Sequence, residues 1–76
     1  MTDSQFYADF GRRLALSRED RGYTQAQFAR ALGLPQSTLA GYEAGARKMP
    51  LHLAWQAART LKVGMGEMFD DREQPG

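Results

Sequence analysis

The apolar positions along the chain recur at helical spacing, and glycine or proline interrupts each run. Phe6, Phe10 and Leu14 lie four residues apart, which predicts a helix over 5–21 that ends at Gly22. No stretch has the sustained alternation or the Val/Ile/Thr-rich composition of a strand. The pattern therefore predicts an all-α fold.

A second helix begins with a recognisable cap. Thr24 stands three residues before Gln27, which is the spacing of a capping box, and Tyr23 and Phe28 stand where a hydrophobic staple would pack around it. Gly33 can take the left-handed conformation that ends a helix. The sequence therefore predicts a short helix over 25–32.

Further helices are predicted over 36–44, closed by Gly45, and over 50–61, with a final helical turn over 67–69. In the 50–61 helix we expect one stripe to face the core, with Trp55 inside it, and we expect His52 on the surface. This buried stripe consists of Leu51, Trp55, Ala58 and Leu61.

One domain over 1–69, followed by an acidic and disordered tail over 70–76, is the expected organisation. The chain has 76 residues, no cysteine and one histidine. These counts argue against a disulfide framework, a thiolate nucleophile and a zinc site, so we expect no metal, no cofactor and no enzyme. No segment approaches a membrane span, and we expect a cytoplasmic protein.

The charges are unevenly placed, although the net charge is only +1. Between Phe10 and Lys62 nine basic residues face three acids, whereas six of the nine acids lie outside this stretch. A basic body with acidic ends is compatible with a nucleic-acid partner, and it is also compatible with ordinary solvated helix faces.

The two short helices over 25–32 and 36–44 have the pattern of a helix-turn-helix. Each is too short to be stable alone, so shared packing must hold the pair at a fixed angle. Ala29 is small enough for close approach, and the backbone must turn at Gly33. The fourth, tenth, fifteenth and eighteenth positions counted from Gln25 are all apolar: Phe28, Leu34, Leu39 and Tyr42.

The segment 24–47 (TQAQFARALGLPQSTLAGYEAGAR) resembles the phage-repressor and Cro-like XRE family. The resemblance begins at Phe10-Gly11, includes Glu43-Ala44-Gly45 at the end of the 36–44 helix, and extends to Val63. It implies a compact five-helix domain of the lambda-repressor type that binds double-stranded DNA as a homodimer. It also implies that the 36–44 helix enters the major groove and reads a palindromic operator, and that the protein represses or regulates transcription.

The 36–44 helix has the composition that base recognition requires, because Leu39 and Tyr42 can face the domain while short polar side chains face outwards. Gln36 is the strongest candidate for a base contact, since a carboxamide pairs bidentately with adenine. The alternative is a polar face that only meets water. The candidate base contacts are Gln36, Ser37, Ala40 and Gly41.

Two departures from the family pattern affect this helix. Gly41 replaces the longer polar side chain that is common there, and Pro35 replaces the usual Ser or Thr cap. Either the backbone at Gly41 comes very close to DNA, or that contact is absent and DNA shape contributes more.

The resemblance also supplies candidate phosphate contacts and one ion pair. Arg18 and Glu43 are implied to pair, and the pair would link the first helix to the end of the 36–44 helix. Solvated loop charge is the alternative for the two basic residues after that helix. The candidate phosphate contacts are Gln25, Thr38, Arg47 and Lys48.

Apolar residues near the C-terminal end suggest an interface, and a second copy of the chain is its simplest occupant. The expected dimer contacts are Leu53, Met65, Met68 and Phe69. No small-molecule ligand is expected in so short a chain. The alternative function is a protein-interaction module, such as an antitoxin or adaptor, that uses the same fold.

Overall fold

The computed structural model describes residues 2–69 of the chain, and the side chains of residues 2–68. This part of the chain contains five α-helices and no strand, so the all-α prediction is confirmed. The predicted tail over 70–76 lies outside the described residues. The helices are α1 (Asp3–Asp20), α2 (Gln25–Leu32), α3 (Gln36–Ala44), α4 (Leu51–Leu61) and α5 (Met65–Phe69).

Helix α1 begins two residues earlier than the apolar spacing predicts, because a cap precedes its first apolar residue. The Gln5 amide N–H donates to the Thr2 hydroxyl over 3.1 Å, and the Thr2 amide donates to the Gln5 side-chain carbonyl over 3.1 Å. This reciprocal capping box satisfies two amides that the first turn leaves free. The helix ends at Asp20, one residue before the predicted end.

Helices α2 and α3 have the predicted bounds. The capping box is present, with the Gln27 amide 3.0 Å from the Thr24 hydroxyl and the Thr24 amide 2.9 Å from the Gln27 side-chain carbonyl. The Tyr23 and Phe28 rings pack with their centroids 5.4 Å apart, as the staple predicted. Gly33 ends α2 with φ of 72°. The sequence therefore specified this helix pair locally.

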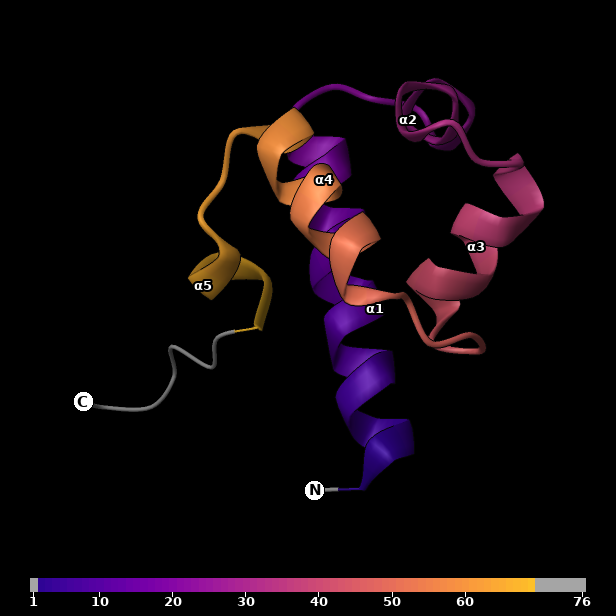
Figure 1. The fold of residues 1–76 in the computed structure, drawn as a ribbon, viewed down its shortest axis with the longest axis vertical. Helices are drawn as coiled ribbons and strands as arrows, with labels where there is room; N and C mark the ends of the chain where they lie inside the picture. The colour runs from indigo at the N-terminus through magenta and orange to yellow at the C-terminus, as the bar shows by residue number, and fades with distance from the viewer. Residues whose placement is uncertain (1, 70–76) are drawn as a thin grey trace.

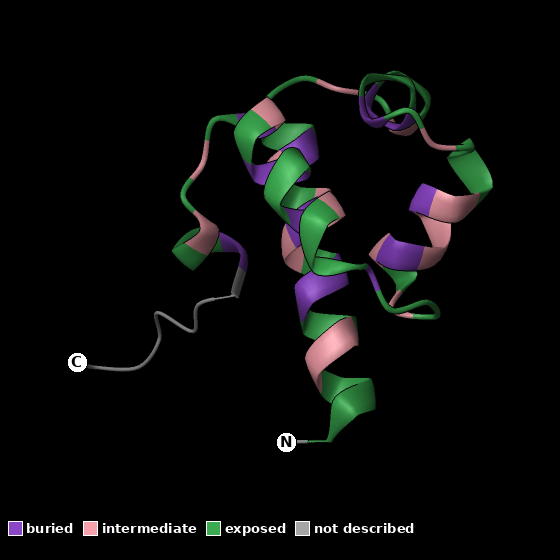
Figure 2. Ribbon diagram, in the orientation of Figure 1, coloured by how far each residue is buried: buried purple, intermediate pink, exposed green. Residues whose placement is uncertain are grey.

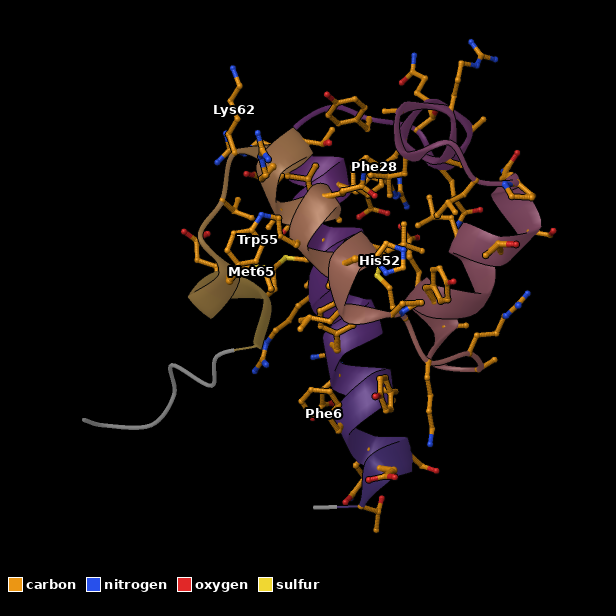
Figure 3. All side chains as sticks on the ribbon, in the orientation of Figure 1. Phe6, Phe28, His52, Trp55, Lys62 and Met65 are labelled. Carbon is orange, nitrogen blue, oxygen red and sulfur yellow. The ribbon has the colours of Figure 1, made fainter. Side chains whose placement is uncertain are left out.

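The helices surround one core, with α2 and α3 on one side of α1 and α5 on the other (Figure 1). Helix α1 contacts both α3 and α5, while α2 contacts α3 and α4. Phe28 lies where α2 faces the rest of the molecule (Figure 3). The largest fully buried side chains are Phe28, Leu14, Leu39, Leu61 and Met68.

Two glycines allow α1 and the end of α3 to come into backbone contact. A Cβ added to Gly11 would lie against the carbonyl oxygen of Tyr42 and 2.5 Å from that of Glu43. A Cβ added to Gly45, which has φ of 76°, would lie 2.6 Å from the Cα of Ala8. Such distances leave no room for a side chain, so the angle of α3 is fixed by main chain against main chain.

Helix α4 buries Ala58 and Leu61 of the predicted stripe, but not Leu51 and Trp55. Its buried residues are Ala54, Ala57, Ala58 and Leu61, whereas Leu51 is 69% exposed and Trp55 is 55% exposed. The alanines let α4 approach the core closely, and packing on that side turns the larger side chains outwards. The prediction that Trp55 belongs to the core is therefore wrong. Figure 2 shows the exposed face of α4 in green.

Helix α5 is longer than the single turn predicted, and it closes the core on the side opposite α3. Met68 has no exposed surface and belongs to the core, while Met65 is half-buried against it. Among the described residues, no helix is long and apolar enough to cross a membrane.

Candidate nucleic-acid interface

Helix α3 has one side in the core and one side towards solvent. Leu39 and Tyr42 are buried, as predicted, and Gln36 and Ser37 at its N-terminal end are exposed. Ala40 is half-buried, and so is Thr38, whose amide is bonded to the Pro35 carbonyl over 3.1 Å. The freely accessible polar surface is thus concentrated in the first turn.

The side chain of Arg47 covers Gly41, the position at which the sequence left open whether the backbone approaches DNA. A Cβ at Gly41 would lie 2.7 Å from Cδ and 2.9 Å from Cγ of Arg47. The Arg47 guanidinium carbon lies 6.0 Å from the centroid of the Tyr42 ring, a distance at which a cation and an aromatic face attract. The glycine therefore provides the space in which Arg47 lies along α3.

Lys48 is exposed on the neighbouring loop and contacts the start of α1. Its Nζ lies 3.7 Å from an Asp3 carboxylate oxygen and 5.7 Å from the centroid of the Tyr7 ring. Both charged side chains are largely solvated, so the pair contributes below about 1 kcal/mol. Lys48 remains available to an anion.

Arg18 and Glu43 form the ion pair that the family resemblance implied, and it is buried. The Nε of Arg18 donates to Glu43 Oε2 over 2.7 Å, and a terminal nitrogen donates to Oε1 over 3.1 Å. Only 9% and 6% of the two side chains are exposed. The hydrogen bonds that Arg18 donates to Glu43 raise the pKa of Arg18 above its ordinary value, although burial opposes the charged form.

The same carboxylate is also bonded to the first residue of α2. The Gln25 side-chain Nε2 donates to Glu43 Oε1 over 3.0 Å. The side-chain oxygen of Gln25, Oε1, accepts from Nε2 of Gln36 over 3.3 Å. A continuous path of hydrogen bonds therefore runs from α1 through the end of α3 and the start of α2 to the exposed tip of α3. It joins Arg18, Glu43, Gln25 and Gln36.

Sequence reasoning named all four residues but did not link Gln25 to Glu43 or to Gln36. The linkage depends on the angle between α2 and α3, which packing sets. Sequence reasoning also missed the 2.8 Å hydrogen bond that Arg18 donates to the backbone carbonyl of Tyr23. This bond links the ion pair to the residue just before the α2 cap. A backbone acceptor leaves no trace in residue identity, so no sequence signal could have revealed it.

The expected dimer contacts are less accessible than the sequence suggested. Met68 is fully buried within this chain and offers no surface to a second copy. Leu53 and Met65 are half-buried against the core, and the Phe69 side chain lies outside the described part. The exposed large apolar residues of α4 are Leu51 and Trp55. Their spacing of four residues was visible in the sequence, but it was assigned to the core.

Leu51 also borders a hollow of about 250 Å³ between the start of α1 and the start of α4. The hollow is lined by Phe6, Tyr7, Phe10, Met49, Leu51 and Ala54. Trp55 extends from α4 on the side where Met65 of α5 lies (Figure 3). We call the surface of Leu51, Trp55 and this hollow the α4 patch. Within residues 2–69, no group of three or more metal-ligating side chains comes together.

The arrangement is that of a helix-turn-helix DNA-binding domain. It consists of a short capped helix, a tight glycine turn and a second helix with a polar outer tip, all held against α1. The model of the helix-turn-helix domain family matches residues 9–70 of this chain. The chain therefore belongs to this family and is a DNA-binding protein of the XRE type, as the sequence predicted.

Individual relatives agree with this assignment. An uncharacterized HTH-type transcriptional regulator of Bacillus subtilis, YazB, is 37% identical over 59 residues, which cover 78% of this chain and 86% of YazB. The restriction-modification controller protein C.AhdI of Aeromonas hydrophila is 32% identical with a TM-score of 0.78, covering 83% of this chain and 96% of that one.

A third comparison concerns the fold alone. A hypothetical transcription factor from Neisseria, NHTF, superposes with a TM-score of 0.83 at 19% identity, over 97% of this chain and 85% of that one. The five-helix arrangement therefore persists where few residues are shared.

Proposed function

We propose that the chain is a homodimeric, sequence-specific transcriptional regulator of the cytoplasm that represses by reading a palindromic operator with α3. The observation that supports this most is the tip of α3, where exposed Gln36 is bonded to Gln25 and thereby to the buried Glu43. A side chain fixed in this way loses little entropy when it meets a base edge.

Gln36 reads an adenine in this proposal. Its carboxamide has a donor and an acceptor that match adenine N7 and N6 in the major groove. Ser37 contacts an adjacent base or phosphate, and Ala40 offers a methyl surface to a thymine methyl group. Gly41 makes no base contact of its own, because Arg47 covers it.

Phosphate contacts come from both sides of α3. Gln25 lies at the N-terminus of α2, where free amides and the helix dipole favour an anion, and one of its side-chain N–H groups has no partner among residues 2–69. Thr38 lies at the flank of α3, and Arg47 and Lys48 are exposed on the loop that follows. These groups hold the register of α3 without selecting a sequence.

Dimerisation occurs through the α4 patch in this proposal, with Met65 and Leu53 at its margins. Helix α3 lies on the side of the molecule opposite α5 (Figure 1). A second copy seated on α4 and α5 would leave both α3 helices free to enter successive major grooves, about 34 Å apart. Apolar surface of this kind is also what an adaptor would use, so the test must separate the two.

The test is a selection of binding sites from random duplex DNA with the whole chain, followed by binding measurements on every single-base variant of the selected site. We expect a palindrome with half-sites one helical turn apart. Gln36→Ala should cost about 1–3 kcal/mol at one symmetric pair of positions and leave other preferences unchanged. A chain that selects no sequence, but forms a stable complex with another protein, would contradict the proposal.

A further inference from the structure

The path of hydrogen bonds below Gln36 has a fixed direction as well as a fixed position. Arg18 can only donate hydrogen bonds, and the Glu43 carboxylate can only accept them. Every contact between these two side chains runs from Arg18 to Glu43. The buried end of the path therefore presents an acceptor, and nothing else, to the next residue.

The direction passes to Gln25 and then to Gln36. Because Glu43 only accepts, Gln25 must turn its Nε2 towards it, which leaves the Gln25 carbonyl oxygen facing Gln36. That oxygen in turn accepts from Nε2 of Gln36. One N–H and the carbonyl oxygen of Gln36 then remain for an external partner, in one of the two orientations that an amide can take.

We propose that Glu43 is a positioning residue for base recognition, because it sets the amide orientation of Gln36 through Gln25. This inference rests on the proposed function, in which Gln36 reads a base. An amide turned by 180° exchanges its donor and acceptor, so the wrong orientation would not match adenine in the same register. The buried ion pair thus selects a base that it does not touch.

The physical reason for placing a carboxylate there is that burial makes the choice costly to reverse. Glu43 is 6% exposed at its side chain, and turning the Gln25 amide would set the Gln25 carbonyl oxygen against a buried carboxylate. A buried carboxylate that loses one of its donors, and faces the negative end of an amide dipole instead, is disfavoured. The orientation of Gln36 is therefore set before DNA arrives.

The first test is Glu43→Gln. An amide at this position replaces two acceptors by one acceptor and one donor, so it no longer imposes one orientation on Gln25. On all single-base variants of the selected site, we expect discrimination at the position read by Gln36 to fall from about 5- to 150-fold towards onefold. Preferences elsewhere should be kept. The matched control is Glu19→Gln, because Glu19 is the exposed partner of Arg18 at 3.6 Å.

A second pair of variants decides the question without replacing either member of the buried ion pair. Gln25→Lys presents only donors, so Gln36 must turn its carbonyl oxygen towards position 25, and the preferred base at that position should change. Gln25→Glu presents only acceptors, so Gln36 keeps its orientation and the preferred base should be kept although overall affinity falls. Circular dichroism establishes that each variant is folded before its profile is measured.

The results separate the two proposals. If Gln36→Ala leaves the profile unchanged, Gln36 does not read a base and the proposed function is wrong at that residue. If Gln36→Ala removes one preference while Glu43→Gln weakens all sites equally and Gln25→Lys keeps the preferred base, only the positioning role is overturned. The double variant Glu43→Gln with Gln36→Ala should have the profile of Gln36→Ala alone.

Discussion

The two sides of the molecule are built on opposite principles. On the side of α3, main chain meets main chain at Gly11, and a buried ion pair joins the helices with bonds of 2.7 and 3.1 Å. On the side of α4, alanines pack inwards and the largest side chains, Leu51 and Trp55, point outwards. On the first side the orientation of α3 is fixed, whereas on the second side large apolar side chains remain exposed.

The difference agrees with the functions that we propose for the two sides. Polar contacts and backbone contacts depend steeply on distance and angle, so they fix a helix more strictly than hydrophobic packing does. A helix that reads base edges needs that strictness. An apolar surface left open is costly for a lone chain, but it is what association with a second copy would cover. The predictions below test each side in turn.

The largest effect is expected at the buried carboxylate. Glu43→Ala leaves Arg18 buried without its partner and should lower the free energy of unfolding by about 3–5 kcal/mol. Glu19→Ala removes the other carboxylate near Arg18, which is 62% exposed, and should cost below about 1 kcal/mol. Urea denaturation followed by circular dichroism measures both. Equal losses would mean that burial does not distinguish the two contacts.

A slightly smaller loss is expected where α1 and α3 meet. Gly11→Ala places a methyl group against two backbone carbonyls that cannot move independently, and overpacking of this kind costs about 1–3 kcal/mol or more. Gly66→Ala is the matched change in α5, where an added Cβ meets nothing within 4 Å. It should be neutral or stabilising by up to about 1 kcal/mol. The unfolding temperature should therefore fall for Gly11→Ala and stay unchanged or rise for Gly66→Ala.

The contrast between the two sides also explains what the sequence could predict. Thr24, Gln27 and Gly33 act within a few residues of themselves, so the bounds of α2 and α3 followed from local rules. The direction in which α4 faces depends on which stripe packs better against the rest of the fold. The large apolar side chain of Trp55 favoured its placement in the core. In the structure, the small alanines are buried because they let α4 pack closely against the other helices.

The site was predictable to the same degree. The exposure of Gln36 and Ser37 could be predicted because they follow a turn and begin a helix, which is local information. For Gly41 the sequence left two possibilities, close approach of the backbone to DNA or no contact, because the return of Arg47 across α3 depends on the shape of the loop between α3 and α4. Tertiary contacts that join residues six or more apart had no counterpart in the local pattern.

Association should weaken when the α4 patch is made polar. Leu51→Ser with Trp55→Ser should raise the dimer dissociation constant by about tenfold or more, because the apolar area that a partner would cover is lost. The fold should be kept, since both side chains are exposed. Leu16→Ser is the control, because Leu16 is 57% exposed but lies among charged side chains on α1. Sedimentation velocity across a concentration series measures the constants. A wild-type chain that stays monomeric on DNA would exclude this interface.

The smallest expected effect concerns how Arg47 is held on α3. Gly41→Ala should favour the helix by up to about 1 kcal/mol, but its Cβ would lie only 2.7 and 2.9 Å from Cδ and Cγ of Arg47 and would displace that side chain. Arg47→Ala should reduce the dependence of log K on log salt by about 0.9 if Arg47 contacts one phosphate. Gly41→Ala should reduce it by a similar or smaller amount.

The decisive measurement is the double variant. If Gly41 acts only by making room for Arg47, Gly41→Ala should have no further effect on DNA affinity once Arg47 is alanine. Lys48→Ala supplies the control, because Lys48 contacts Asp3 and Tyr7 and not Gly41, so its effect should add to that of Gly41→Ala. If Gly41→Ala weakens binding equally with and without Arg47, the backbone at Gly41 itself approaches the DNA, which is the first of the two possibilities that the sequence left open.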